Sequence, residues 1–265
     1  MNSILHNQGE STDEKLRVTL VCNAGVLLEY RGTKVLMDSI YGPEGHPFSN
    51  LTDVTWQQML QGEGLFSRVD YLLFTHAHPD HFSPGMTMQY LQHRPVKGVF
   101  KPQADRPDSA LDAFLRERRI PCVDLSRKTD HASFRVEPHL TVRAFTAQHL
   151  DRKFWGVRHL CYVLSFDDKH VLFTADVDYM STSFDVVKDL PLRAVFLNPL
   201  FFRAFHNPKY FHGSLKAENF CVYHVPFQED DTMQMRYMLQ RDLANWPREE
   251  GAAVALTEPW QTVEL

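Results

Sequence analysis

The sequence lacks any apolar run long enough to cross a membrane. No stretch of its 265 residues approaches the roughly 18 consecutive apolar residues that a membrane span requires. The first 15 residues are polar and acidic, without the apolar segment of a secretory signal. We therefore expect a cytoplasmic protein with no membrane partner, in which residues 1–15 form a flexible N-terminal tail.

Cysteine is scarce, and its spacing fits neither a disulfide framework nor a C-x-x-C motif. The four cysteines, Cys22, Cys122, Cys161 and Cys221, lie far apart in the chain. Three of them fall in apolar runs. We therefore expect buried free thiols in a reducing compartment rather than disulfides.

Positive charge is not in excess either. Lysine and arginine number 28 against 33 acidic residues, and the net charge of −5 does not suit a polycation that coats nucleic acid. A nucleic-acid partner is therefore not expected, although a local basic patch stays compatible with this charge. The sequence also has no G-x-S-x-G motif and no cysteine beside a plausible base, so it shows no sign of a serine or cysteine nucleophile.

The apolar pattern alternates between the periods of strands and helices along the whole chain. Strands are predicted over residues 17–22, 26–30, 34–38, 69–75, 98–101, 133–136, 140–146, 161–166, 170–175, 194–200 and 219–225, and helices over 52–61, 83–93, 109–119 and 232–245. The first three strands indicate an antiparallel meander. Because no repeat or linker interrupts the pattern, we expect one layered domain of the α/β or α+β class over residues 16–265.

Histidine is the abundant residue, and three of the 14 histidines gather in one short segment. Residues 74–82 read F-T-H-A-H-P-D-H-F, which places His76, His78, Asp80 and His81 between a predicted buried strand and a predicted helix. Imidazole and carboxylate groups suit zinc, iron and manganese, and alternate residues on an extended segment can bind one ion together. The segment therefore predicts a metal site.

The motif T-H-A-H-P-D-H-F after an apolar strand resembles the metal-binding motif of the metallo-β-lactamase superfamily, and the resemblance extends from residue 17 to the C-terminus. It implies an α+β fold, the αββα four-layer sandwich, with two divalent metal ions. His76 and His78 would bind the first metal, and Asp80 and His81 the second. Among family members, the pattern is most similar to hydrolases related to sugar-phosphate lactonases.

The same resemblance implies three further ligands downstream. His149 follows the strand over residues 140–146 and matches the third histidine of the first metal. Asp176 ends an apolar strand and matches the bridging aspartate, and His224 matches the final histidine.

Some of these assignments have rivals. The family usually has glycine before the bridging aspartate, where this chain has Ala175, and Asp178 competes with Asp176 for the bridging position. His212 competes with His224; it would otherwise contact substrate or donate a proton. His159 and His206 lie where they would approach the site, but we do not expect either to be a ligand.

This ligand set implies a metal-dependent hydrolase that uses a metal-activated hydroxide on a small ester, lactone or phosphodiester. Asp80 would orient the hydroxide or accept its proton, and the leaving group would take a proton from His212 or a metal-bound water. Zinc is the expected metal, with Mn²⁺ and Fe²⁺ as alternatives.

Other functions on the same scaffold stay open. One is a sulfur (persulfide) dioxygenase with a single iron, another an RNA-end-processing nuclease, and a third a binding protein without activity. The diiron oxygen-reducing branch typically has glutamate where this chain has His78, which argues against that branch.

The substrate is the least defined part of the hypothesis. Residues 199–211 are rich in aromatic side chains and contain Arg203 and Lys209. They would suit a pocket wall for a small anionic substrate, or would simply pack one edge of the core. A homo-oligomer is compatible with the sequence.

Overall fold

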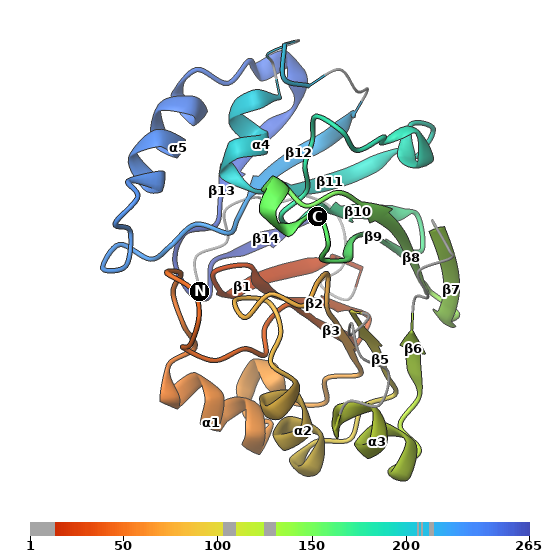
Figure 1. Ribbon diagram of the computed structural model, residues 1–265. Helices are drawn as coiled ribbons and strands as arrows, with labels where there is room; N and C mark the ends of the chain where they lie inside the picture. Colours follow the sequence, from red (N-terminus) through yellow and green to blue (C-terminus); the bar gives the residue numbers. More distant parts are fainter. Residues whose placement is uncertain (1–13, 103–109, 125–130, 206, 208, 212–214) are drawn as a thin grey trace.

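The computed structural model describes residues 14–102, 110–124, 131–205, 207, 209–211 and 215–265. Two seven-stranded sheets lie face to face, with helices α1, α2 and α3 on the outer side of one and α4 and α5 on the outer side of the other (Figure 1). This arrangement confirms the predicted αββα sandwich. None of the described helices is long and apolar enough to span a membrane.

The first sheet has the strand order β14-β1-β2-β3-β4-β5-β6. The antiparallel meander is confirmed, and its strands are β1 (Arg17–Cys22), β2 (Gly25–Tyr30) and β3 (Thr33–Met37). Parallel strands then follow, namely β4 (Tyr71–Leu73), β5 (Gly98–Lys101) and β6 (Cys122–Asp124), while β14 (Thr262–Glu264) pairs antiparallel with β1. The helices of this half are α1 (Asp53–Gln61), α2 (Pro84–His93) and α3 (Ala110–Glu117).

The second sheet has the order β13-β12-β11-β10-β9-β8-β7. Its antiparallel strands are β7 (His131–Glu137), β8 (Leu140–Ala147), β9 (His159–Phe166) and β10 (Lys169–Phe173), and its parallel strands are β11 (Leu192–Leu197), β12 (Ala217–Val222) and β13 (Ala252–Ala255). Helices α4 (Pro199–Ala204) and α5 (Met235–Ala244) cover it, and short 3-10 turns span Gly64–Phe66, Arg152–Phe154, Asp185–Val187 and Arg248–Glu250.

The central strands β10 and β11 of the second sheet bury both faces. Phe173 and Phe196 belong to the larger apolar cluster, which reaches from this sheet to the first one. Their chain neighbours Leu172 and Val195 belong to the smaller cluster, which includes Phe201 of α4. Because successive side chains of a strand point to opposite faces, continuous apolar runs are what a sheet covered on both sides requires.

Several local features match their sequence signals. Thr52 caps α1, and Ser83 caps α2 with Pro84 in its first turn. The four cysteines are free, with Cys122 exposed and the other three buried.

The strand predicted over residues 194–200 is too long. It ends at Leu197, because Asn198 caps α4 by accepting from the Phe201 N–H, and Pro199 begins that helix. The strands β6, β13 and β14 were not predicted.

Candidate metal centre

Five chain segments bring polar side chains together at the edge where the two sheets meet. Asp38 follows β3 and residues 76–81 follow β4 in the first sheet. His149 follows β8, Asp176 follows β10 and His224 follows β12 in the second. All seven predicted ligands fall into two groups of four that share one residue, and the ligand atoms within each group lie within 4.8 Å of one another.

The first group consists of His76, His78, His149 and Asp176. The Nε2 of His76 lies 3.0 Å from the Nδ1 of His78 and 3.7 Å from the Oδ2 of Asp176. The Nε2 of His149 lies 3.5 Å from the same carboxylate oxygen. The imidazoles of His76 and His149 thus face the same oxygen of Asp176, and His78 lies against His76.

The second group consists of Asp80, His81, His224 and again Asp176. The Nε2 atoms of His81 and His224 are 3.0 Å apart, and the Nε2 of His224 lies 3.1 Å from the Oδ1 of Asp176. Asp80 reaches both histidines through its Oδ2, at 3.5 and 3.4 Å. The Oδ2 of Asp176 also lies 3.5 Å from the Nε2 of His81, so the carboxylate of Asp176 contacts histidines of both groups, as a bridging carboxylate would.

The geometry favours Asp176 over Asp178, whereas the choice of His224 over His212 stays a prediction. Asp178 belongs to neither group, because its carboxylate accepts from the Met180 N–H and the Ser181 hydroxyl. His224 joins the second group, whereas His212 and His206 lie outside the described residues.

The polar atoms of the cluster fit a divalent metal. Three of them, the Nε2 of His78, the Nε2 of His149 and the Oδ2 of Asp80, are buried without a hydrogen-bond partner. Leaving a buried polar atom unpaired costs about 1–3 kcal/mol, so an accumulation of such atoms calls for an additional partner. Nitrogen and carboxylate donors in groups of four are the set that zinc prefers.

Burial and neighbouring charges give the two groups different protonation. Burial, with His81 next in importance, holds the pKa of His76 well below its usual range, and burial and His149 lower the pKa of His78 to about 4. Burial works in the same direction on His224, but Asp176 and Asp80 override it and raise its pKa to about 9. Without metal, His76 and His78 are thus neutral at pH 7, whereas the second group holds protons, because Asp80 and Asp176 also raise the pKa of His81 well above its usual range against the effect of burial.

The aspartates of the cluster stay ionised. Burial alone would raise the pKa of Asp80, but His81 and His224 lower it to about 2. The same two histidines keep the pKa of Asp176 well below its usual range against the effect of burial. Ionised carboxylates at both positions suit binding of a cation.

Asp38 orients residues of the cluster through hydrogen bonds, and the sequence did not predict this role. Its Oδ2 accepts from the Thr75 hydroxyl at 2.6 Å and lies 2.9 Å from the Nδ1 of His81, while its Oδ1 accepts from the Thr75 N–H at 2.8 Å. The Thr75 hydroxyl in turn lies 3.0 Å from the Nδ1 of His76. A carboxylate that holds the Nδ1 proton of a histidine leaves Nε2 free for a metal.

Three residues at this edge have a left-handed backbone conformation. Asp38, Ala175 and His224 have φ values of 48°, 44° and 59°. For Ala175, which stands where the family usually has glycine, this conformation costs about 1–2 kcal/mol. Two hydrogen bonds hold it, since its N–H donates to the Tyr223 hydroxyl and its carbonyl accepts from Asn198. The substitution of alanine for glycine thus leaves the turn that presents Asp176 intact.

His159 lies beside the first group without belonging to either. Its ring centroid is 5.0 Å from that of His76, and neither of its buried ring nitrogens has a hydrogen-bond partner. Burial lowers its pKa to about 3, so the imidazole is neutral.

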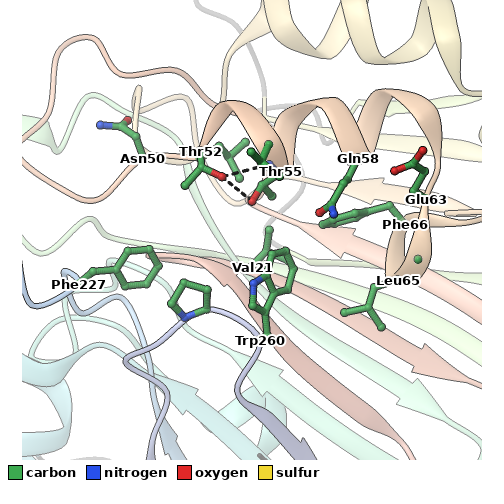
Figure 2. Close-up of a pocket in the computed structure, with 14 residues that line it drawn as sticks. Val21, Asn50, Thr52, Thr55, Gln58, Glu63, Leu65, Phe66, Phe227 and Trp260 are labelled. Atoms are coloured by element: carbon green, nitrogen blue, oxygen red, sulfur yellow. Dashed lines mark hydrogen bonds between the residues drawn. The ribbon is translucent and has the colours of Figure 1, made fainter. Parts of the chain in front are cut away.

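One cavity opens at the site, and a second lies apart from it. A small one of about 120 Å³ opens directly over the cluster and is lined by His149, Asp176 and His224. A larger one, about 650 Å³, lies beside α1, between Phe66, Phe227 and Trp260 (Figure 2), and none of the predicted ligands lines it.

Residues 33–198 match the family model described as the beta-lactamase superfamily domain, which covers more than half of the chain and most of the cluster. The chain belongs to the beta-lactamase superfamily. A comparison of its sequence with curated proteins gives no match.

Solved structures share the fold at low identity. A possible metal-dependent hydrolase from Veillonella parvula is 13% identical with a TM-score of 0.65, over 95% of this chain and 100% of that one. The metallo-β-lactamase fold protein YhfI from Bacillus subtilis is 12% identical with a TM-score of 0.59, over 95% and 100%. CmlA, a diiron β-hydroxylase from Streptomyces venezuelae, is 18% identical with a TM-score of 0.55, over 97% of this chain but 55% of that one, so this chain spans about half its length.

Proposed function

We propose that the protein is a hydrolase that holds two divalent metal ions, with zinc expected at both positions, and cleaves a small ester, lactone or phosphodiester. The observation that carries the proposal is the position of Asp176, which belongs to both groups of histidine and aspartate side chains and whose carboxylate contacts histidines of each. A shared carboxylate of this kind is a feature of sites that hold two metals close together.

His76, His78 and His149 would hold the first ion with Asp176, and Asp80, His81 and His224 would hold the second with the same aspartate. Such ions lower the pKa of a bound water toward neutrality and polarise the substrate carbonyl or phosphoryl oxygen.

Asp80 has the position of a proton acceptor. Its Oδ2 is buried without a hydrogen-bond partner, and His81 and His224, against the effect of burial, keep its pKa at about 2. The ionised oxygen would accept a hydrogen bond from the attacking water and align it. Because the pKa of Asp80 is so low, its carboxylate is better suited to orienting the water than to keeping the proton that the water releases. His212 stays the proposed donor to the leaving group, as the sequence indicated.

The proposal is tested with metal-loaded protein and four substrates, namely 4-nitrophenyl acetate, 4-nitrophenyl pentanoate, a γ-lactone and bis(4-nitrophenyl) phosphate. His76→Ala and Asp80→Ala should each abolish turnover while the circular dichroism spectrum is retained. Asp178→Asn is the matched control, since Asp178 is buried beside the site but belongs to neither group. Activity that survives in both alanine variants would overturn the assignment.

Metal identity separates the alternatives. One iron per chain, with oxygen uptake in the presence of a persulfide, would favour the sulfur dioxygenase. Cleavage of RNA ends, with binding that weakens steeply as salt rises, would favour the nuclease.

A further inference from the structure

The cavity over the cluster has apolar walls. Beyond His149, Asp176 and His224 at its base, it is lined by five apolar residues, which we call the throat: Phe48, Leu150, Pro199, Leu200 and Met235. The Phe48 ring stands against the His224 ring with centroids 4.7 Å apart and planes at 87°, so the throat begins directly at the second group.

No lysine or arginine is among the described residues that line this cavity. The two cations of the aromatic segment do not line it either, and the Lys209 ammonium lies over the Tyr210 ring. The one charge at the rim outside the predicted ligands is the carboxylate of Asp151, which pairs with Lys153 at 3.0 Å. Apart from the metal ions proposed at the base of the cavity, a negative group held against the throat would therefore lose water without meeting a cationic side chain, which is unfavourable.

The remaining polar side chain of the cavity is already engaged. The Oδ1 of Asn198 accepts from the Phe201 N–H, and its Nδ2 donates to the Ala175 carbonyl. Both ends of the amide thus serve the backbone, and neither is left to recognise a polar substituent.

The cavity is also small. Its volume of about 120 Å³ is somewhat below the roughly 150 Å³ of an apolar cavity that holds benzene. An acyl chain of about four or five carbons would therefore fill it.

We propose that the throat is an acyl subsite that selects an uncharged, apolar acyl group of about four or five carbons. This inference rests on the proposed hydrolase function and narrows it from esters, lactones and phosphodiesters to carboxylic esters or lactones. It favours an uncharged acyl group, whereas the cations of residues 199–211 suggested an anionic substrate.

The first experiment compares three 4-nitrophenyl esters on metal-loaded protein, the acetate, the pentanoate and the glutarate monoester. Pentanoate and glutarate have the same five-carbon chain, but glutarate ends in a carboxylate. Each buried methylene is worth about a fourfold gain, so kcat/KM, corrected for intrinsic reactivity, should rise by up to about 60-fold from acetate to pentanoate. It should fall at least about tenfold from pentanoate to glutarate.

The second experiment uses Leu200→Lys, which adds a cation to the throat at a position that is 42% exposed and therefore tolerates the change. The ratio of kcat/KM for glutarate over pentanoate should rise by about tenfold or more. The matched control is Val54→Lys, a residue that is 68% exposed and lines the larger cavity beside α1. That variant should leave the ratio unchanged.

A binding readout separates this inference from the proposed function. Saturation-transfer NMR with pentanamide, a neutral compound, should show contact of its methyl protons with the wild type and Val54→Lys, and weaker contact with Leu200→Lys. Turnover of all three esters without the pentanoate preference would overturn the acyl subsite and leave the hydrolase standing. If no ester, lactone or phosphodiester is cleaved, the hydrolase proposal fails. The pentanamide signal alone then decides: its loss in Leu200→Lys supports the apolar subsite, and no difference from the wild type overturns it.

Discussion

Replacing Asp38 by asparagine should weaken both metal positions without unfolding the protein. Asparagine matches aspartate in shape and accepts the left-handed backbone found here, where φ is 48°. It keeps an oxygen for the Thr75 N–H, but it presents an amide NH2 where Oδ2 now meets the Thr75 hydroxyl and the Nδ1 of His81. His81 must then accept at Nδ1, which moves its proton to the Nε2 that faces the second group.

The magnitude follows from how many ligands Asp38 orients. It contacts His81 directly and reaches His76 through the Thr75 hydroxyl, so each group loses support for one histidine. Loss of such a supporting contact typically lowers metal affinity by about 10–100-fold, or about 1.4–2.7 kcal/mol. Thr75→Val removes only the hydroxyl that links Asp38 to His76, so it should weaken the binding of the first metal alone.

Stepwise dissociation constants for zinc, measured by competition with a chromophoric chelator, check this prediction. Asp178→Asn is the control, because Asp178 is a buried aspartate whose carboxylate also accepts from a backbone N–H and a hydroxyl, without contacting a predicted ligand. The reasoning is refuted if Asp38→Asn leaves both constants unchanged, or if Thr75→Val and Asp178→Asn weaken both metals as much as Asp38→Asn does.

Three further predictions concern protons, stability and His212. Against the effect of burial, Asp176 and Asp80 raise the pKa of His224 to about 9 and the pKa of His81 well above its usual range. The second metal must therefore displace protons below about pH 9, and its affinity should fall by at least about tenfold per unit as pH falls. The affinity of the first metal should depend less on pH, since burial lowers the pKa values of His76 and His78; chelator titrations with equal slopes for both metals would contradict this. Chelation should lower the thermal unfolding midpoint by about 20 °C, because each of the two ions, at a free concentration a thousandfold above its Kd, adds about 4 kcal/mol of stability. Calorimetry with verified metal content would show no shift if the ions do not bind the folded state. His212→Ala should lower kcat far more than metal content, whereas loss of one metal per chain would make His212 a ligand.

The sequence was sufficient for features that depend on local pattern. The meander of β1 to β3 and the capped helices α1 and α2 follow from apolar periodicity, Thr52, Ser83 and Pro84, all of which act within a few residues. The histidine motif was recognised because four of the seven predicted ligands lie within six residues.

Features that depend on the assembled fold were missed. Asp38 meets Thr75 from 37 positions earlier in the chain, and only the parallel pairing of β3 with β4 brings the two together. The throat combines side chains from separate loops and helices, so no single segment could reveal its lack of cations. One local signal was overlooked, since Asn198 followed by Pro199 marks a helix start inside the strand predicted over residues 194–200.

The central claim is that one chain holds two divalent metals that share Asp176. Inductively coupled plasma mass spectrometry tests it most directly. The protein is purified without chelator from cells grown with ample zinc. The account predicts close to two zinc ions per chain in the wild type. A content near zero, or a single iron per chain, would contradict it.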